Sequence, residues 1–236
     1  VMPIMSLIND FMSLIYQRLC PCCKGTLLLH ETHICTACEV GLPKSSNHLD
    51  GNSELIRVFA GRVPLIKAYS LYRYQKSGKV QRLLHAIKYK GQKETAEYLG
   101  FLFATYLLSS DTLSGMDGII PVPLHRRRLK MRGYNQSEWF ARGLATGSGI
   151  PLFTNMLERN VATSTQTRKK KYQRWENVEG VFRLPDPALL CNKHVLLVDD
   201  VITTGATIEA AWLALKEASG LSLSVASIAF AGKETI

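Results

Sequence analysis

The stretch from His194 to Thr207 constrains the fold of this chain more than any other segment. Its sequence, HVLLVDDVITTGAT, contains an unbroken apolar run at 195–198, which is typical of a strand buried on both faces of a parallel sheet. Asp199 and Asp200 follow at the carboxyl end of that predicted strand. Open α/β sheets bind ligands at this edge. The stretch therefore predicts a mostly parallel α/β sheet with a ligand site where the strand ends.

A loop of small and hydroxyl-bearing residues connects this strand to a predicted helix. Apolar residues at positions 208, 211, 212 and 215 have helical spacing, and Gly220 lies just past the expected helix end. Backbone N–H groups and the positive end of the helix dipole would meet the hydroxyl groups of the loop at one point. An anion is therefore expected to bind the loop residues Thr203, Thr204, Gly205, Ala206 and Thr207.

Two acids, a TTGAT loop and a helix, in that order, resemble the phosphoribosyl pyrophosphate (PRPP) motif of type I phosphoribosyltransferases. The resemblance implies that Asp199 and Asp200 hold the ribose hydroxyls of PRPP and that the loop wraps its 5-phosphate. A receiver domain carries its phosphate-accepting acid early in the chain, whereas this pair lies near the C-terminus. A P-loop requires Gly-Lys-Ser/Thr, which is absent. A purely structural strand, turn and helix is the remaining alternative.

Length and composition fit one α/β domain with a small appendage. The chain has 236 residues, of which 46% are hydrophobic, so it can bury a sizeable core and bulk disorder is excluded. A net charge of +10 favours anionic partners such as phosphorylated metabolites, pyrophosphate or nucleic acid. The N-terminus lacks the pattern of a signal peptide, and no segment has the length and apolar character of a membrane span. We therefore expect a cytoplasmic protein without stable membrane insertion.

Four of the six cysteines form two close pairs of the CxxC type, with eleven residues between the pairs. Four thiolates arranged in this way complete a tetrahedral zinc shell, and a shell without an open position is structural. A thioredoxin-like dithiol needs only one pair and a βαβ setting. Cys22 could replace a neighbour, and ligation by His30 or His33 is a further alternative. The expected zinc ligands are Cys20, Cys23, Cys35 and Cys38.

Hydrophobic periodicity predicts an alternation of helices and strands. An N-terminal helix and the zinc module are expected over 1–60, with residues 39–66 irregular, and the main domain over 61–236. Helices are predicted at 4–19, about 80–90, about 92–108, 136–147 and from 208. Strands are predicted at 68–74, 152–160, 180–184 (at the sheet edge), 195–198 and 221–231. A further strand and loop are predicted at 117–124, where Pro121 and Pro123 mark that the strand has ended. A basic run at 126–132 follows the predicted strand and loop at 117–124. A basic loop at 163–177 lies between the predicted strands at 152–160 and 180–184.

The order of these features resembles the ComF family of bacterial competence-associated phosphoribosyltransferases, over nearly the whole chain. The resemblance rests on the cysteine pairs and on the motifs LHAIKYKG at 84–91, IPVPLH at 120–125, RGYNQ at 132–136, QT at 166–167 leading to RxxNV at 174–178, and VDDVITTGAT at 198–207. One departure is Arg168-Lys169-Lys170, where many members carry Gly-Leu. The resemblance implies a sheet with an overhanging hood, a zinc ribbon, PRPP bound with Mg²⁺, and a role in DNA uptake or in the use of imported DNA.

The same resemblance implies a role for each part of the site. Backbone around 122–124 would face the pyrophosphate, and Mg²⁺ would bridge pyrophosphate and ribose oxygens. Basic side chains and the 163–177 loop would close over the ligand and exclude water. The residues expected to act in the transfer are Asp199, Asp200 and Arg132. Those expected to bind substrate are Val122, Pro123, Leu124, Lys88, Lys90, Asn135, Gln136, Gln166, Arg168, Arg174 and the five loop residues at 203–207.

The leading hypothesis is a PRPP-binding phosphoribosyltransferase that releases pyrophosphate, with a nucleobase among the candidate acceptors. The alternative is a single-stranded-DNA-binding competence factor with this fold and little or no transfer activity, because Tyr134, Tyr172 and Trp175 interleave with the basic segments. A regulator that reads PRPP without turnover is a third hypothesis. Other competence or DNA-processing proteins are the expected protein partners.

Overall fold

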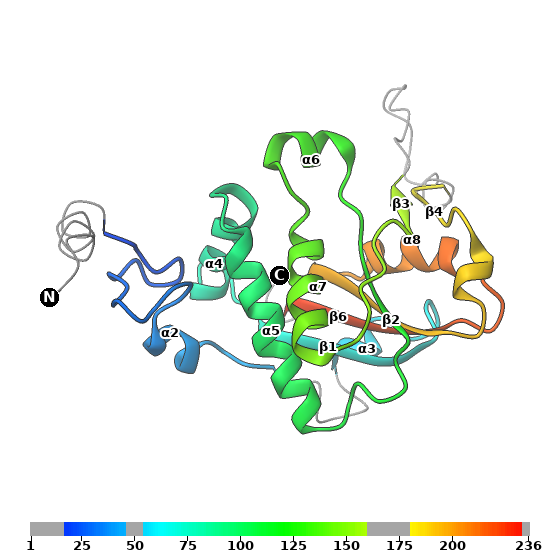
Figure 1. Ribbon diagram of the computed structural model, residues 1–236, viewed down its shortest axis with the longest axis horizontal. Helices are drawn as coiled ribbons and strands as arrows, with labels where there is room; N and C mark the ends of the chain where they lie inside the picture. Colours follow the sequence, from blue (N-terminus) through cyan, green and yellow to red (C-terminus); the bar gives the residue numbers. More distant parts are fainter. Residues whose placement is uncertain (1–16, 46–53, 160–179, 233–236) are drawn as a thin grey trace, which may run out of the picture.

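A four-stranded parallel sheet forms the centre of the computed structural model, which describes residues 17–45, 54–159 and 180–232. The strand order is β1-β6-β5-β2, and every pair is parallel. The carboxyl ends of all four strands therefore lie at one edge of the sheet (Figure 1). The strands are β1 (Leu65–Arg73), β2 (Gly118–Pro121), β5 (His194–Ile202) and β6 (Ser222–Phe230).

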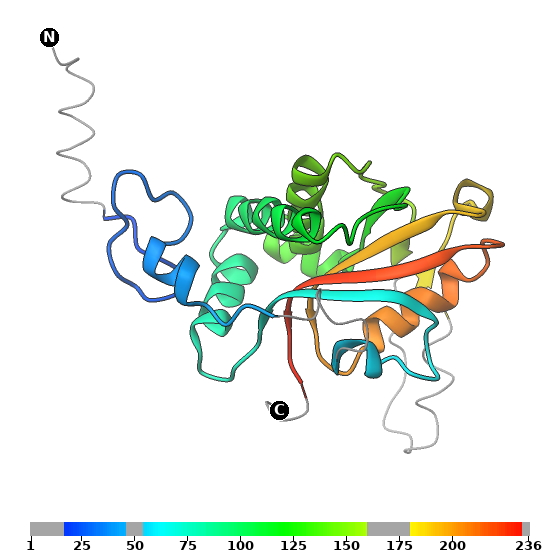
Figure 2. The same cartoon turned by 90° about the horizontal axis from the view of Figure 1, so that it is seen from below.

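Helices cover both faces of the sheet, and Figure 2 shows the layers. One core joins α5 and α7 to residues such as Leu196 and Val198, and the other joins α3 and α8 to Val195 and Leu197. This alternation along β5 reflects the period of two in a strand. The helices are α2 (Thr36–Gly41), α3 (Glu54–Arg57), α4 (Lys79–Tyr89), α5 (Lys93–Ser109), α6 (Arg126–Arg132), α7 (Gln136–Ser148) and α8 (Ala206–Leu215), with a short 3-10 turn, η1, at Pro187–Leu190.

Helices α5 and α7 approach each other at two glycines. A Cβ atom at Gly143 would lie 1.8 Å from the carbonyl oxygen of Glu97, and one at Gly100 would lie 2.1 Å from that of Phe140. Only glycine permits such close backbone contact. The contact fixes α7 against the sheet so that its first turn lies beside the carboxyl end of β5.

The cysteine-containing segment at 17–45 docks on α5 and on the edge strand β1. Tyr98 of α5 donates a hydrogen bond to Glu39, with 2.6 Å between the oxygens. Backbone bonds run from Ser45 N to Leu71 O (2.9 Å) and from Arg73 N to the carbonyl oxygen of Pro43 (2.8 Å). Side chains from this segment thus share the core on the α5 side of the sheet.

The predicted fold class is confirmed: a parallel sheet flanked by helices, with a four-cysteine cluster near the N-terminus. The main strands and helices occur where periodicity predicted them. Residues 4–16 and 163–177 lie outside the described residues. The boundary at residue 60 stays a prediction. Within the described ranges, no helix combines the length and apolar character needed to cross a bilayer.

Local predictions were wrong for the segments 152–160, 180–184 and 39–66, and one helix, in the basic run, was not predicted. The basic run forms α6, which His125 caps by accepting a hydrogen bond from Arg127 N. The predicted strand at 152–160 is reduced to β3 (Glu158–Arg159) and a bridge from Leu152 to Ile119. The segment 180–184 contains β4 (Phe182–Arg183), which pairs with β3 in a separate antiparallel sheet instead of joining the main sheet. The predicted irregular segment 39–66 also contains the end of α2 and all of α3.

Candidate functional site

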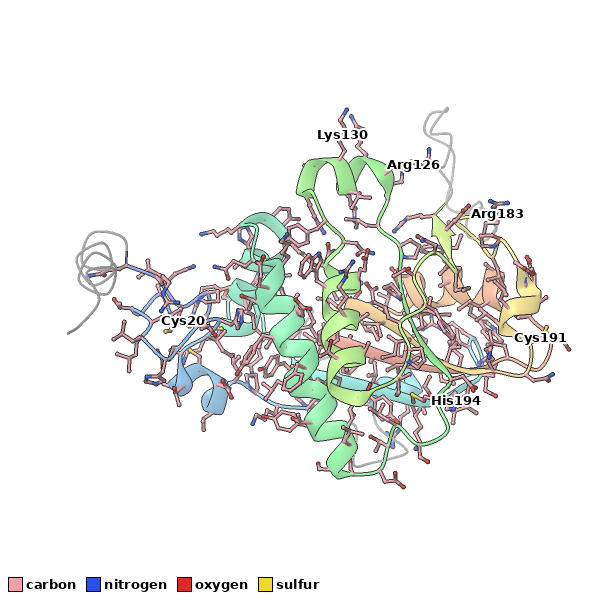
Figure 3. All side chains as sticks on the ribbon, viewed as in Figure 1. Cys20, Arg126, Lys130, Arg183, Cys191 and His194 are labelled. Atoms are coloured by element: carbon pink, nitrogen blue, oxygen red, sulfur yellow. The ribbon has the colours of Figure 1, made fainter. Side chains whose placement is uncertain are left out.

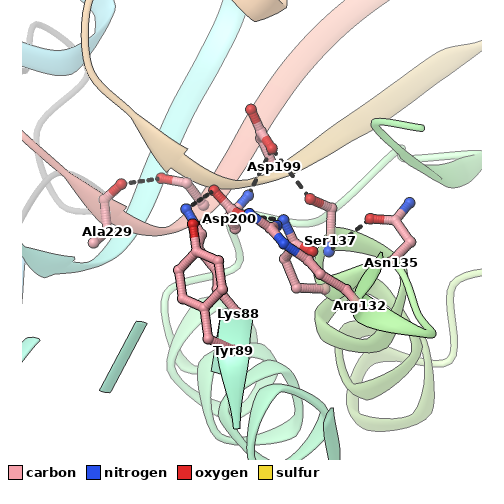
Figure 4. A network of polar contacts seen from close by, with 10 residues as sticks. Lys88, Tyr89, Arg132, Asn135, Ser137, Asp199, Asp200 and Ala229 are labelled. Atoms are coloured by element: carbon pink, nitrogen blue, oxygen red, sulfur yellow. Dashed lines mark hydrogen bonds and ion pairs between the residues drawn. The ribbon is translucent and has the colours of Figure 1, made fainter. Parts of the chain in front are cut away.

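Asp199 and Asp200 lie near the carboxyl end of β5, and two other elements contact them (Figure 4). Ser137 of α7 donates its hydroxyl hydrogen to Asp199 at 3.1 Å, and the N–H of Asp200 donates to the same carboxylate at 2.8 Å. Lys88 Nζ of α4 lies 3.0 Å from one oxygen of Asp200, while the Gln136 side-chain amide donates to the other. Each carboxylate thus receives donors from a helix beside the strand.

The Asp199 carboxyl has an unusual proton affinity. Burial raises the pKa of Asp199 to about 7, and the neighbouring charge of Asp200 adds to the rise, while hydrogen bonds and Lys88 oppose it. Two adjacent carboxylates in a poorly solvated position resist joint ionisation. A cation or a set of hydroxyl donors placed here would relieve that repulsion.

The end of α4 forms one wall of the site. The guanidinium of Arg132 lies 5.0 Å from the centre of the Tyr89 ring and donates to its hydroxyl at 3.3 Å. Tyr134 donates its hydroxyl hydrogen to the carbonyl oxygen of Ile87. These contacts join α4 to the segment between α6 and α7, so Lys88, Arg132 and the first turn of α7 are held together.

The loop at 203–207 encloses a small hollow beside Asp199, about 40 Å³ in volume. Gly205 has a φ of 79°, and a Cβ atom there would lie 2.6 Å from the Phe59 ring, so this position requires glycine. Arg62 donates to the carbonyl oxygen of Thr204 at 2.9 Å and forms an ion pair with Glu209 at 2.8 Å. The hollow lies at the N-terminus of α8, where partial positive charge favours a small anion.

The segment after β2 lies beside the same edge. Val122 N donates to the carbonyl oxygen of Val198 at 2.8 Å, and the Asn135 side chain donates to the carbonyl oxygen of Val122 at 3.0 Å. Asn135 also caps α7 by accepting a hydrogen bond from Ser137 N at 3.1 Å. Pro123 and Leu124 remain partly exposed next to this fixed turn.

A larger cavity of about 670 Å³ lies on the other side of Asp200. It is open to solvent between α4, the ends of β1, β5 and β6, and the first residues of the Thr-rich loop. Its volume is in the usual range for small-molecule sites. Its lining includes Tyr74, Lys76, Gln81, Leu84, His85, Lys88, Tyr89, Asp200, Val201, Thr203, Thr204 and Ala231.

The two cysteine pairs meet in one cluster in the segment at 17–45. The four sulfur atoms lie within 4.8 Å of one another, and those of Cys23 and Cys35 are 3.7 Å apart. A tetrahedral zinc ion with thiolate ligands requires a sulfur separation of about 3.8 Å. The cluster therefore fits zinc. Cys22, although buried, lies outside this group, and His33 stacks on Tyr98 with ring centres 4.9 Å apart.

Hydrogen bonds from backbone N–H groups support the thiolate form of Cys20. Burial raises the pKa of Cys20, but N–H donors from Cys35, Cys23 and Cys22 outweigh that effect and lower it to about 6. Cys35 N lies 3.4 Å from the Cys20 sulfur, and Gly25 N lies 3.4 Å from the Cys23 sulfur. Burial raises the pKa of the Cys22 thiol to about 12, and it also raises the pKa of Cys35 and Cys38.

The structure brings most of the predicted site residues together. Lys88 and Gln136 contact Asp200, Arg132 contacts Tyr89 next to Lys88, and Asn135 contacts Val122. Residues 122–124 and 203–207 lie at the same edge of the sheet. Lys90 is exposed and lies apart from the cavity lining. The predicted substrate residues Gln166, Arg168 and Arg174 lie outside the described residues.

Sequence reasoning missed three contacts, made by Ser137, Tyr89 and Arg62. Ser137 directly follows the RGYNQ motif and lies in the first turn of the helix predicted there. Its place beside Gln136 at the start of that helix is the signal that could have identified it. Two buried atoms, Arg132 Nε and Gln136 Oε1, have no hydrogen-bond partner among the residues described. An unpaired buried donor and acceptor beside a cavity are unfavourable in the free protein and available to a ligand.

Comparison with known proteins supports this reading of the site. Residues 134–235 match the family described as "Phosphoribosyl transferase domain". The matched segment contains α7, both acids and the Thr-rich loop. The chain is therefore a phosphoribosyltransferase-domain protein with a four-cysteine cluster preceding that domain.

Relatives define the family more closely. The chain is 30% identical over 205 residues to "DNA utilization protein YhgH" of Salmonella typhimurium, covering 80% of this chain and 87% of that protein. It is 27% identical to "Competence protein ComFC" of Bacillus subtilis, covering 89% and 82%. It is 38% identical to "Competence protein F" of Haemophilus influenzae, over 39% of this chain and 41% of that protein. The chain belongs to the ComF/YhgH family.

A hydrogen bond connects the cysteine-containing segment to α4, which forms one wall of the site. Arg82 of α4 donates through Nε to the carbonyl oxygen of Cys22 at 2.7 Å, and Cys22 lies between two cluster cysteines. We predict that removing zinc with a chelator will speed amide hydrogen exchange in α4 as well as in 17–45. Arg82→Gln should weaken the attachment of α4 by about 1 kcal/mol. Hydrogen-exchange mass spectrometry measures both effects.

The matched control is Lys79→Gln, which removes the same charge from an exposed position at the start of α4. It should leave exchange in α4 unchanged. Faster exchange confined to 17–45, with α4 unaffected by either chelation or Arg82→Gln, would show that the cluster does not support the site.

Proposed function

We propose that this protein binds PRPP and transfers its 5-phosphoribosyl group to a nitrogen nucleophile, with release of pyrophosphate. The observation that carries the proposal is the pair Asp199 and Asp200 placed between a phosphate-sized hollow and a larger cavity. The names of its relatives, which refer to DNA utilization and competence, support a role in the uptake of DNA or the use of imported DNA.

The site supports one arrangement of the ligand. The 5-phosphate would accept hydrogen bonds from the loop at 203–207, at the N-terminus of α8. The ribose hydroxyls would donate to Asp199 and Asp200, which lie directly beside that loop. The pyrophosphate would extend toward the turn at 122–124 and Arg132, whose Nε has no partner among the described residues. The cavity next to Asp200 then remains for the acceptor.

The proposed reaction requires no nucleophilic side chain. The bond from ribose C1 to the pyrophosphate oxygen breaks, that oxygen keeps the electron pair, and the acceptor nitrogen donates its lone pair to C1. Positive charge develops on the ribose and negative charge on the leaving group. The acids would pin the ribose beside the acceptor, Arg132 would stabilise the departing charge, and Lys88 would hold Asp200 in position. Positioning of the two substrates supplies much of the rate enhancement in such a site.

The residues present also fit a divalent cation. The raised pKa of Asp199 reflects burial and the charge of Asp200, and both causes are relieved by a cation nearby. Mg²⁺ prefers oxygen ligands, keeps several waters and associates with phosphate groups. Bound with PRPP, it would neutralise charge on the pyrophosphate. Zinc at Cys20, Cys23, Cys35 and Cys38 would be structural, because four thiolates leave no open position.

Calorimetric titration with PRPP and Mg²⁺ tests the assignment of the site. We predict saturable binding, and an affinity at least about 100-fold weaker in the double variant Asp199→Asn, Asp200→Asn. Each charge-assisted hydrogen bond contributes about 1.5–3 kcal/mol, and 1.4 kcal/mol corresponds to tenfold. The variant should stay folded, because it removes the repulsion between two adjacent carboxylates.

Asp111→Asn is the matched control. Asp111 is exposed and has a left-handed backbone conformation with a φ of 49°, which asparagine tolerates well. Its affinity for PRPP should equal that of the unaltered protein. Undiminished binding in the double variant would show that PRPP binds elsewhere, whereas lack of binding by the unaltered protein would refute the proposal. Pyrophosphate release with added acceptors separates an enzyme from a regulator that only reads PRPP.

Binding of single-stranded DNA is a second candidate function, favoured by the position of α6. This helix buries none of its residues, and Figure 3 shows Arg126 and Lys130 pointing away from the body of the protein. Burial and the charge of nearby Arg128 lower the pKa of Arg159, so positive charge also gathers near α6. A projecting cationic helix with exposed Met131 suits a flexible polyanion.

Fluorescence anisotropy across a salt series tests the DNA hypothesis. The triple variant Arg126→Gln, Arg128→Gln, Lys130→Gln should bind an oligonucleotide more weakly. A plot of log affinity against log salt has a negative slope, and the variant should make that slope less steep by about 2. Each phosphate contact contributes about 0.7 to its magnitude for single strands. PRPP binding should not change. A slope that is unaffected by the triple variant would exclude α6 as the DNA contact.

A further inference from the structure

Four hydrogen-bond acceptors in the wall of the cavity beside Asp200 each already receive one donor. One oxygen of Asp200 forms an ion pair with Lys88, and the other accepts a hydrogen bond from the Gln136 amide. The side-chain oxygen of Gln81 accepts a hydrogen bond from Ser77 N. The carbonyl oxygen of Thr204 accepts one from Arg62. Exocyclic amino groups of a neutral base would therefore meet few free acceptors along these parts of the wall.

The same cavity offers donors and positive charge. Lys76 lines it and has no ion-pair partner in the part of the chain that the structure describes. Lys88 adds a second cation, although Asp200 balances it. The Tyr89 hydroxyl accepts its hydrogen bond from Arg132 and so keeps its own hydrogen to donate. His85 contributes ring nitrogens on the same side of α4. The excess of donors and cations favours a ligand that carries acceptors and negative charge.

The aromatic and aliphatic side chains that line the cavity favour a ligand with a flat ring. The rings of His85 and Tyr89 lie one helical turn apart, with centres 4.9 Å from each other and planes inclined by 45°. Leu84, Val201 and Ala231 supply apolar surface in the same cavity. Aromatic and aliphatic side chains of this kind pack against the faces of planar ligands.

We propose that the cavity binds a planar nitrogen-containing ring that carries a carboxylate, with Lys76 as the residue that selects the anionic group. The ring would lie along the His85 and Tyr89 side of α4, with its carboxylate toward Lys76 and its reacting nitrogen toward the proposed position of the ribose. This inference rests on the proposed function, because it names the class of acceptor for the same site. Lys76 is exposed, and a neutral base of the same shape would form no ion pair with it.

Matched ligand pairs test the proposal by calorimetry on the full chain with ribose 5-phosphate present. The pairs are uracil against orotate and nicotinamide against nicotinate, in which the second member of each pair carries the carboxylate. The carboxylated member of at least one pair should bind about tenfold or more tightly than its neutral partner, which is the scale of one charge-assisted hydrogen bond. Lys76→Gln should abolish that preference, and Lys79→Gln, nearby on the same segment, should preserve it.

Equal or tighter binding of the neutral members would overturn the proposal, and so would binding of ribose 5-phosphate without any of the four rings. A preference that survives Lys76→Gln would remove Lys76 from its selecting role. If carboxylated rings bind while ribose 5-phosphate does not, the proposed function fails but the ligand class of the cavity stands. The two claims are therefore separable in a single set of titrations.

Discussion

Two carboxylates on consecutive residues of a buried strand are the constraint on which the rest of the site depends. Burial and mutual repulsion raise the pKa of Asp199 to about 7, so the free protein must supply donors to keep the pair in place. It does so from two helices, with Ser137 and Gln136 on α7 and Lys88 on α4. The docking of α7 in turn requires Gly143, which lets its backbone contact α5. The need of the two adjacent carboxylates for hydrogen-bond donors thus connects the packing of the helices to the geometry of the site.

Helix α4 is the element that the other parts share. One end reaches the cysteine cluster through Arg82, and the other carries Lys88 to Asp200. Its exposed side lines the cavity in which we place the acceptor. We therefore expect a metal ion bound at the four cysteines to influence the position of Lys88 through α4.

Local patterns allowed much of the fold to be predicted from the sequence. The segment 194–207 encodes strand, acids, loop and helix in consecutive residues, and two CxxC pairs define four ligands by spacing alone. Contacts between distant residues were not predictable in this way, since Gln136 and Asp200 are 64 positions apart. Helix α6 was missed because its run of cations has no apolar periodicity, and its helix depends on a histidine cap. Cys22 could be separated from the cluster only when the directions of the sulfur atoms were known.

The central claim is that the acids, the Thr-rich loop and Arg132 hold the two ends of a single PRPP molecule. A crystal structure of the complex with PRPP and Mg²⁺ tests it most directly. We expect the 5-phosphate against 203–207, the ribose hydroxyls within hydrogen-bond distance of Asp199 and Asp200, and the pyrophosphate beside 122–124 and Arg132. A 5-phosphate bound outside that loop, or a pyrophosphate in the cavity between Lys76 and Tyr89, would contradict it.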